Sequence, residues 1–448
     1  MRQTEDVTAA VLSNFYESLV DLDGQLSLTP HLALQWTNPT ERTWHFTLRP
    51  GVLFHDGSPF GAADVVASLE RAQRLPDGKL AADLRAATAR ALDDRTVELV
   101  TDRPRPLLLV RLAALAILPR GTSDAEVLRP VGTGPYRFLS AGEGRKVIQG
   151  ERWERYWGRA PDAARFTIEA LQEDARNLSS ADVVSPLPPA GPSGAAADVS
   201  PASSGLRVVV HPTVMTAFLV CDVRPGSPFA TLEARRALSG ALDREALVKV
   251  ARNASPASQL VARGINGYEP AIGRPRPAPR DVRGKPIEAE LLVSPASEAA
   301  GREIARQAAA AGFRLSVVAL PWTERYARMR AGRAALSLAF WTAGTGDASS
   351  LFEPLLHTAG GPEGFGSENT SGYSNPELDA ELARAATEMS PSARAELLRS
   401  AMRRAMTDLP LIPLYNVSER LGLRPGLELT PRLDRAVRVS EIRIRPAS

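Results

Sequence analysis

The chain has 448 residues, of which 44% are hydrophobic and 23% are charged, the proportions of an ordinary globular protein. Because a single hydrophobic core stops growing at roughly 250–300 residues, this length predicts two or more domains. The 54 Lys and Arg residues against 51 Asp and Glu leave a net charge of only +3, and no basic stripe carries interleaved aromatic residues, so a nucleic-acid partner is not favoured. The chain has no window of about 20 uninterrupted apolar residues, so the sequence predicts no membrane span.

The periodicity of apolar residues predicts an α/β pattern without internal repeats. The predicted helices are Val7–Asp21, Ala62–Arg74, Leu232–Arg252, Glu298–Ala311, Trp322–Ala331, Asn375–Met389 and Ala393–Thr407. The predicted strands are Trp44–Leu48, Thr96–Val100, Tyr136–Leu139, Lys146–Gln149, Thr167–Leu171, Arg207–His211, Ala217–Cys221, Ile287–Val293, Arg314–Leu320 and Leu336–Trp341. Between Ile287 and Trp341 strands alternate with helices, which is typical of a parallel α/β layer. The stretches Ser185–Gly205 and Asn253–Arg283 are predicted loops.

One segment, Trp44–Ala72, joins a strand, a turn and a helix in a recognisable order. Trp44, Phe46 and Leu48 alternate with polar residues, the period of a half-buried strand. A turn with the sequence Phe-His-Asp-Gly follows, and then an amphipathic helix. Further motifs lie before and after it, namely Asn14–Val20, Pro30–Trp36, Val131–Tyr136, Arg235–Arg244, Gly372–Asp379 and Leu409–Tyr415.

These motifs resemble, in the same order, those of the family 5 extracellular solute-binding proteins of ABC importers, the peptide and nickel type. The resemblance implies an α/β, two-lobe fold like that of the type II, cluster C periplasmic binding proteins, with a ligand cleft between lobes joined by two hinge segments. Lobe I would comprise residues 1–220, including the Phe-His-Asp-Gly subdomain, and 416–448, and lobe II residues 221–415. The chain would cross near Leu219–Asp222 and return near Leu414–Asn416.

The function implied by the resemblance is that of the substrate-binding component of an importer. Such a protein captures a small solute, here oligopeptide-like or peptide-derived and opine-like, and delivers it to permease subunits in the inner membrane. We expect a monomer in the periplasm, or outside the cell at the membrane, that is not an enzyme and needs no cofactor. No signal peptide is visible at the start of the chain, and the family's first strand, upstream of Val7, is missing, which suggests a trimmed chain or a start codon assigned too late. The single Cys221 excludes an intrachain disulfide.

The resemblance places the ligand at the loop Phe340–Ser350, directly after a predicted strand. In dipeptide-binding relatives, an Asp three residues after the Trp of this loop holds the α-ammonium of the peptide. Here Trp341 is followed at that position by Gly344, so a ligand without a free α-amine, such as an opine or a sugar conjugate, becomes more plausible. The alternative is that Asp347 takes over the amine, and an equal alternative is that Asp347 caps a helix from Ser349 onward. The candidate ligand residues of this loop are Trp341, Thr342, Gly344 and Asp347.

The remaining candidate ligand residues are Met215, Thr216, Thr133, Tyr373 and Tyr415. Met215 and Thr216 precede the first predicted crossing, where strand packing is the favoured interpretation. Thr133 lies in a Gly-Thr-Gly-Pro turn, and each tyrosine has an apolar ring and a polar tip, so it either closes a pocket or lies at a lobe surface.

Three alternative functions stay open. A metal chelate, nickel or metallophore, is the alternative within the family, although none of the five histidines shares the helical spacing of a metal site, so no metal ligands are predicted. A hydrolytic enzyme using the cleft is the alternative from another class, but the chain has no Gly-x-Ser-x-Gly elbow, no phosphate loop and no His-Glu-x-x-His, so no catalytic residue is predicted. The third is a regulatory binding module.

Overall fold

The computed structural model describes residues 10–75, 84, 86–125, 127, 129–142, 146–170, 178, 180–186, 205–273 and 286–445. The chain divides into two compact units. Unit 1 consists of Met1–His211 and Arg420–Ser448, and unit 2 consists of Pro212–Glu419. Unit 1 is therefore discontinuous in sequence.

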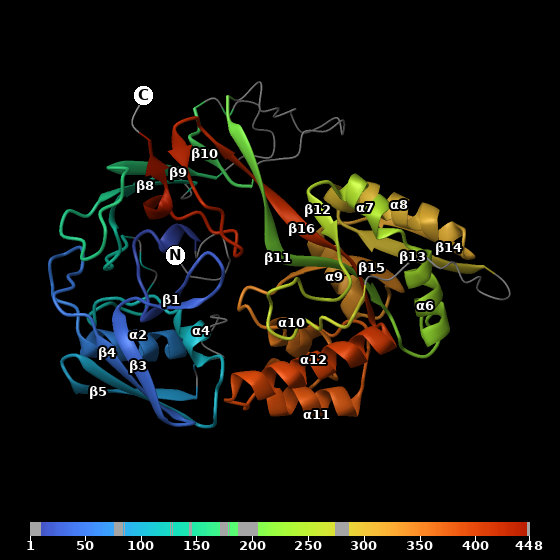
Figure 1. Cartoon of the computed structure of the whole chain (residues 1–448), viewed down its shortest axis with the longest axis horizontal. Coiled ribbons are helices and arrows are strands. Elements are labelled where there is room, and N and C mark those ends of the chain that lie inside the picture. Colours follow the sequence, from blue (N-terminus) through green and yellow to red (C-terminus); the bar gives the residue numbers. More distant parts are fainter. Residues whose placement is uncertain are drawn as a thin grey trace. The chain divides into compact units, whose positions relative to one another are not determined.

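Two long strands carry the chain from one unit to the other. They are β11 (Arg207–Cys221) and β16 (Leu411–Leu423), shown in Figure 1. The segments Leu219–Asp222 and Leu414–Asn416, where we expected the chain to cross, lie at the end of β11 and inside β16, on the unit 2 side of both divisions.

Unit 1 contains a four-stranded antiparallel sheet in the order β3-β4-β6-β5. Its strands are β3 (Ala33–Thr40), β4 (Thr43–Leu48), β5 (Ala87–Asp93) and β6 (Thr96–Thr101). Burial alternates strictly along β4, with Trp44, Phe46 and Leu48 inside, which confirms the predicted strand. The predicted helix Ala62–Arg74 is confirmed as α2, which packs on β5 and β6. The Asp64 carboxylate accepts a hydrogen bond from the Gly61 amide at its start, 2.9 Å.

A second sheet of unit 1 has the order β7-β8-β9 and is antiparallel. Its strands are β7 (Tyr136–Ala141), β8 (Val147–Arg152) and β9 (Arg165–Glu169), and all three overlap predicted strands. Smaller elements complete the unit, namely β1 (Val20–Leu22), β2 (Leu28–Pro30), α4 (Leu108–Leu112), β10 (Val183–Val184), β17 (Leu427–Glu428), the short 3-10 helix η4 (Val439–Glu441) and β18 (Arg443–Ile444).

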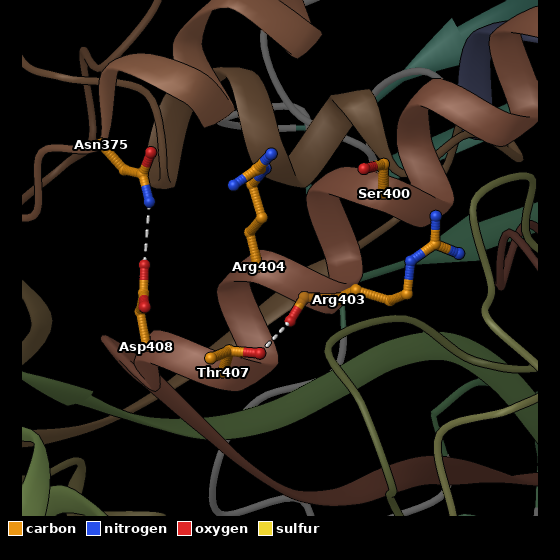
Figure 2. Close-up of a pocket in the computed structure, with 6 residues that line it drawn as sticks. All are labelled: Asn375, Ser400, Arg403, Arg404, Thr407 and Asp408. Carbon is orange, nitrogen blue, oxygen red and sulfur yellow. Dashed lines mark hydrogen bonds between the residues drawn. The ribbon is translucent and has the colours of Figure 1, made fainter.

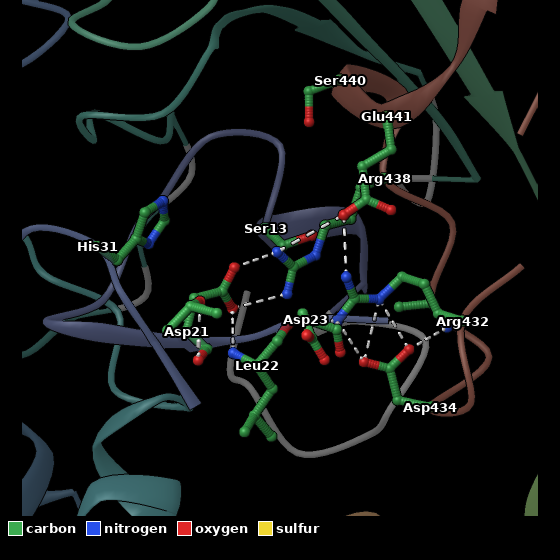
Figure 3. Close-up of polar contacts among 12 residues, drawn as sticks. Ser13, Asp21, Leu22, Asp23, His31, Arg432, Asp434, Arg438, Ser440 and Glu441 are labelled. Carbon is green, nitrogen blue, oxygen red and sulfur yellow. Dashed lines mark hydrogen bonds and ion pairs between the residues drawn. The ribbon is translucent and has the colours of Figure 1, made fainter. Parts of the chain in front are cut away.

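The end of the chain returns to the core of unit 1 near its beginning. Val439 and Ile442 pack in one buried cluster with Phe15, Tyr16 and Tyr136. Figure 3 shows the polar contacts beside this cluster. Arg438 Nη2 donates to Asp21 Oδ1, 2.8 Å, and the buried Arg432 donates to the Leu22 carbonyl, 2.7 Å. Arg438 and Asp21 are 417 positions apart in sequence. The end of the chain thus completes a core that its beginning starts.

The predicted helix Val7–Asp21 is wrong over most of its length. Among described residues only 10–12 are helical, and Val20–Leu22 forms strand β1. The reason is that other parts of unit 1 use the carbonyls that a helix would need. The amide of Gly134 donates to the Phe15 carbonyl, 3.0 Å, and the amide of Ile117 donates to the Glu17 carbonyl, 2.9 Å.

Unit 2 is built on a mixed sheet in which β12 (Ala254–Pro256), β16, β11, β15 (Leu336–Thr342), β13 (Ile287–Val293) and β14 (Phe313–Ala319) follow one another. Strand β13 pairs in parallel with β14 and β15, whereas β11 pairs antiparallel with β15. The predicted parallel layer between Ile287 and Trp341 is therefore confirmed. The predicted strands Arg207–His211 and Ala217–Cys221 are one continuous strand, β11, because Pro212 does not interrupt it.

The helices of unit 2 are α6 (Leu232–Ala241), α7 (Arg244–Ala251), α8 (Glu298–Ala309), α9 (Trp322–Arg330), α10 (Ser349–Leu355), α11 (Pro376–Ala385) and α12 (Pro391–Asp408), with short 3-10 turns η2 (Pro295–Ser297) and η3 (Pro362–Gly364). The predictions for α8, α9, α11 and α12 are confirmed. The single predicted helix Leu232–Arg252 is two helices, since the Asp243 carboxylate accepts from the Glu245 and Ala246 amides and starts α7. Helices α11 and α12 pack against each other (Figure 1).

Two predicted loops fall partly outside the described residues. Of Ser185–Gly205, residues 187–204 lie outside them, and of Asn253–Arg283, residues 274–283 do. The described part of the second loop contains strand β12, which pairs with β16.

Candidate functional site

Two neighbouring strands of unit 2 bring four predicted ligand residues together. In the antiparallel register of β11 and β15, Met215 lies opposite Thr342 and Thr216 lies opposite Trp341. The indole Nε1 of Trp341 donates to the Ser350 carbonyl, 2.9 Å, so this side chain bridges the end of β15 and the start of α10. The Thr216 hydroxyl donates to the Asn416 side chain of β16, 3.0 Å. Thr216 therefore ties the two long strands together.

Tyr415 lies on β16 and is only 4% exposed. Its ring meets Phe340 of β15 edge-on, with ring centroids 6.4 Å apart, and it is paired with Pro256 of β12. Burial raises the pKa of the Tyr415 hydroxyl to about 12, so it is neutral at physiological pH. Tyr415, Phe340 and the Met215–Thr342 pair thus all lie on strands that meet in this sheet.

Gly344 is not required by the local backbone or by packing. It does not have a positive φ, and a Cβ built on it would meet nothing nearer than the Thr342 side chain, 4.0 Å away. A Cβ therefore fits at this position. The absence of an acid there is therefore a difference in chemistry and not a consequence of crowding.

Asp347 is buried, and its carboxylate is held inside the protein. Arg394 of α12 donates to both oxygens, from Nη2 to Oδ1, 2.9 Å, and from Nε to Oδ2, 3.1 Å. Asn266 donates to Oδ2, 2.8 Å, and the Ser349 amide at the start of α10 donates to Oδ1, 2.9 Å. Burial alone would raise the pKa of Asp347, but the charge and hydrogen bonds of Arg394 outweigh it and hold the pKa below its ordinary value. Asp347 is an ionised partner of Arg394.

Tyr373 is also engaged within unit 2. Its hydroxyl donates to Asp408 Oδ2, 2.6 Å, and Asn375 donates to the same oxygen, 2.9 Å. Burial raises the pKa of the Tyr373 hydroxyl. This contact anchors the segment before α11 to the end of α12.

An open groove of about 310 Å³ lies beside this contact on α12, lined by Asn375, Ser400, Arg403, Arg404, Thr407 and Asp408 (Figure 2). Its two arginines are paired with carboxylates. Arg403 bonds Glu269 and Glu396, and Arg404 bonds Glu377 and Glu381. These carboxylates offset the positive charge, so the groove has little attraction for an anion.

Thr133 belongs to unit 1, whereas the other predicted ligand residues belong to unit 2. Its side chain is fully buried, and within the described part of the chain its hydroxyl has no hydrogen-bond partner. The neighbouring Gly134 amide donates to the Phe15 carbonyl, 3.0 Å, which holds the Gly-Thr-Gly turn against the start of the unit.

Sequence reasoning missed Arg394 and Asn266, the partners of Asp347. Arg394 is 47 positions from Asp347 in sequence. The signal that could have found it is its place on the buried face of α12, four residues before Leu398 and seven before Ala401. Among the described residues, no group of three or more His, Cys, Asp and Glu side chains is arranged to hold a metal ion. No helix of the described chain is long and apolar enough to cross a membrane.

Comparison with known proteins identifies the family. A family model described as bacterial extracellular solute-binding proteins, family 5, middle, matches residues 27–293. The glutathione-binding protein GsiB of Pectobacterium atrosepticum is 27% identical, over 95% of this chain and 87% of that protein.

Solved structures agree in fold. A dipeptide-binding protein from Pseudoalteromonas sp. SM9913, in complex with Met-Leu, has a TM-score of 0.78 at 20% identity, over 99% of this chain and 96% of that one. NikA from Brucella suis, in complex with Fe(III)-EDTA, has a TM-score of 0.82 at 18% identity, over 98% of this chain and 95% of that one. The chain has the type II periplasmic-binding-protein fold and belongs to family 5 of the bacterial extracellular solute-binding proteins, the substrate-binding components that serve ABC permeases.

Proposed function

We propose that this chain captures a small peptide-like or opine-like solute without holding an α-amine of the ligand on a carboxylate. Two features of the 343–348 loop carry this proposal: position 344 is a glycine, and the carboxylate of Asp347 is held by Arg394. Position 344 carries no acid, although a Cβ would fit there, and Arg394 donates to both carboxylate oxygens of Asp347.

The expected effect on ligand choice follows from the strength of the missing contact. A hydrogen bond between an ammonium and a carboxylate contributes about 1.5–3 kcal/mol, which is about tenfold or more in affinity. Without it, a free α-amine adds little, and a ligand with a blocked or absent α-amine is not penalised. N-blocked peptides and opines belong to this class.

Glutathione is a second candidate, favoured by the similarity to the glutathione-binding proteins GsiB, whose alignments cover 95% of this chain. In glutathione the first residue is joined through its γ-carboxyl, so its amine is far from the first peptide bond. A carboxylate placed for the α-ammonium of an ordinary dipeptide is not required for such a ligand.

The setting of this function is also proposed. We infer a monomer that works in the periplasm and performs no covalent chemistry, because the family and the GsiB relatives are solute-binding proteins. A hydrolytic side activity would appear as cleavage of a bound peptide, which mass spectrometry after overnight incubation detects.

A thermal-shift panel tests the proposal. A ligand that binds only the folded protein raises Tm, by an amount that grows with its concentration relative to Kd. The panel contains glutathione, opines, di- to pentapeptides with free and acetylated amines, and nickel and iron chelates. We expect shifts with glutathione, opines or acetylated peptides. A shift confined to free-amine peptides, or to chelates, contradicts the proposal.

A further inference from the structure

The loop that joins β15 to α10, residues 343–348, is held by two segments that are distant in sequence. One is the segment around Asn266, and the other is the first turn of α12, which carries Arg394. The sequence motifs did not predict these contacts. They fix the backbone that follows Trp341 and Thr342.

The first segment pairs with the loop through its backbone. The Asn266 amide donates to the Gly346 carbonyl and the Ala348 amide donates to the Asn266 carbonyl, both 2.9 Å. The next residue, Gly267, has φ +94°, and a Cβ there would approach the Ala348 Cβ to 2.9 Å and the Leu398 Cβ to 2.8 Å. Only glycine allows the segment to lie so close to both α10 and α12.

The second segment contributes a buried cation. Arg394 is 3% exposed, donates to both oxygens of Asp347 and to the Ser349 hydroxyl, 3.0 Å, and bonds the Ala385 carbonyl at the end of α11. Arg394 therefore links the loop to both α11 and α12. A planar guanidinium is suited to this two-oxygen contact, and a lysine ammonium is not.

The acceptor capacity of Asp347 is filled. A carboxylate has about four lone-pair sites. Asp347 accepts from Ser349 N, Asn266 Nδ2, Arg394 Nε and Arg394 Nη2. A ligand ammonium would have to displace one of these donors, in a site where an unpaired buried charge is costly.

We propose that Arg394 and Asp347 are positioning residues for ligand binding, which act by holding the 343–348 backbone in one arrangement and do not contact the ligand. This inference rests on the proposed function, since the loop is taken as part of the ligand site. If the arranged loop falls to about one-tenth of the population, the apparent Kd rises about tenfold for every ligand that uses it.

The test compares four proteins. They are the wild type, Arg394→Lys, the double variant Asp347→Asn with Arg394→Gln, and Arg235→Lys as a control. The double variant removes both charges, so no unpaired buried charge prevents folding. Arg235 is a similarly buried arginine of unit 2 whose hydrogen bonds, among the described residues, go to the backbone carbonyls of Phe229, Ala230 and Asp408. Circular dichroism first establishes the temperature at which all four are folded.

Two readouts are taken at that temperature. Hydrogen exchange without ligand follows the amides of residues 343–349, and calorimetry measures Kd for glutathione and for one dipeptide with a free and an acetylated amine. We expect faster exchange in this segment for both Arg394 variants and not for Arg235→Lys. We also expect Kd to rise about tenfold, by the same factor for the free and the acetylated dipeptide.

The outcomes separate the two proposals. Unchanged exchange at 343–349 in both Arg394 variants overturns the positioning role. A loss of affinity confined to the free-amine dipeptide overturns it as well, because it makes Asp347 a ligand contact. If the wild type binds none of the probes, the ligand proposal fails, and the exchange comparison still decides whether Arg394 holds the loop.

Discussion

Arg394 holds Asp347 with two hydrogen bonds, from Nη2 to Oδ1 at 2.9 Å and from Nε to Oδ2 at 3.1 Å, and the two side chains are 4% and 5% exposed. The same carboxylate accepts the Ser349 amide, so the ion pair reaches from α12 to the start of α10. Asp347, the only acid of the 343–348 loop, therefore has a structural role, since it links α12 to the start of α10.

Breaking this pair from one side should destabilise unit 2. Asp347→Ala leaves the Arg394 cation buried without its carboxylate, and we expect the free energy of unfolding to fall by about 3–5 kcal/mol. Urea denaturation followed by circular dichroism measures it. Glu298→Ala, which removes the surface pair with Arg302, is the control and should have little effect. A loss for Asp347→Ala as small as that of the control contradicts the prediction.

The Asp347 pair also predicts a pH dependence. The pKa of Asp347 is lower in the folded protein than the ordinary value of about 4, so its stabilisation is complete above that value and is lost as the pH falls through the folded pKa. We expect the stability difference between wild type and the double variant Asp347→Asn with Arg394→Gln to shift against the wild type below about pH 4. Urea titrations at a series of pH values measure this difference. A difference that is constant across this range is inconsistent with an ionised Asp347.

His31 in unit 1 should give a dependence of the opposite sign. Burial lowers the pKa of His31, but the contact of its Nε2 with Glu17, 3.1 Å, outweighs burial and leaves the pKa raised. The stabilisation is complete below the ordinary value of about 6.5 and is lost as the pH rises through the folded pKa. His31→Gln should therefore cost more stability at about pH 5.5 than at about pH 9. His45→Gln, at a more exposed pair with Glu98, is the control, and equal costs for His31→Gln at both pH values count against the prediction.

Gly344→Asp should change ligand preference without changing the fold. A Cβ at this position meets nothing nearer than 4.0 Å, and by the resemblance described above the new carboxylate stands where dipeptide-binding members of the family carry an acid. We expect affinity for free-amine dipeptides to rise about tenfold, while affinity for their acetylated forms does not rise. Calorimetry on matched peptides measures this, and Gly344→Asn controls for size. The same gain for Gly344→Asn would show that charge is not involved.

The two tyrosines should respond differently to loss of the hydroxyl. Tyr373→Phe removes a hydrogen bond to the Asp408 carboxylate, so we expect a loss of about 1.5–3 kcal/mol in stability and little change in Kd. In Tyr415→Phe no described hydrogen bond is lost, so stability should be retained, and Kd should rise if Tyr415 is a ligand residue, as expected from the sequence. Thermal unfolding and calorimetry on both variants measure the contrast. A weakened Kd only in Tyr373→Phe would reverse the assignment.

Local sequence patterns were sufficient to predict the elements that show a regular apolar periodicity. The alternation of Trp44, Phe46 and Leu48 predicted β4, and the order of elements between Ile287 and Trp341 predicted the parallel layer. Arg207–His211 and Ala217–Cys221 were predicted as separate strands, yet one strand, β11, continues through Pro212. The first predicted helix failed because the carbonyls of Phe15 and Glu17 bond distant segments.

The candidate site was predictable only in part. The loop after Trp341 was found from its resemblance to a family motif, and the absence of an acid at Gly344 was visible in the sequence. The role of Asp347 was not, because its partners Arg394 and Asn266 lie 47 and 81 positions away, and long-range pairing leaves no local pattern.

The most direct measurement is calorimetric titration of the wild-type protein with glutathione, an opine and one peptide in its free and N-acetylated forms. If recognition does not use a carboxylate–ammonium pair, at least one ligand of the set binds, and acetylation weakens peptide binding by less than about threefold. Binding of the free peptide that acetylation abolishes would contradict the proposal and place an acid of this chain on the ligand amine.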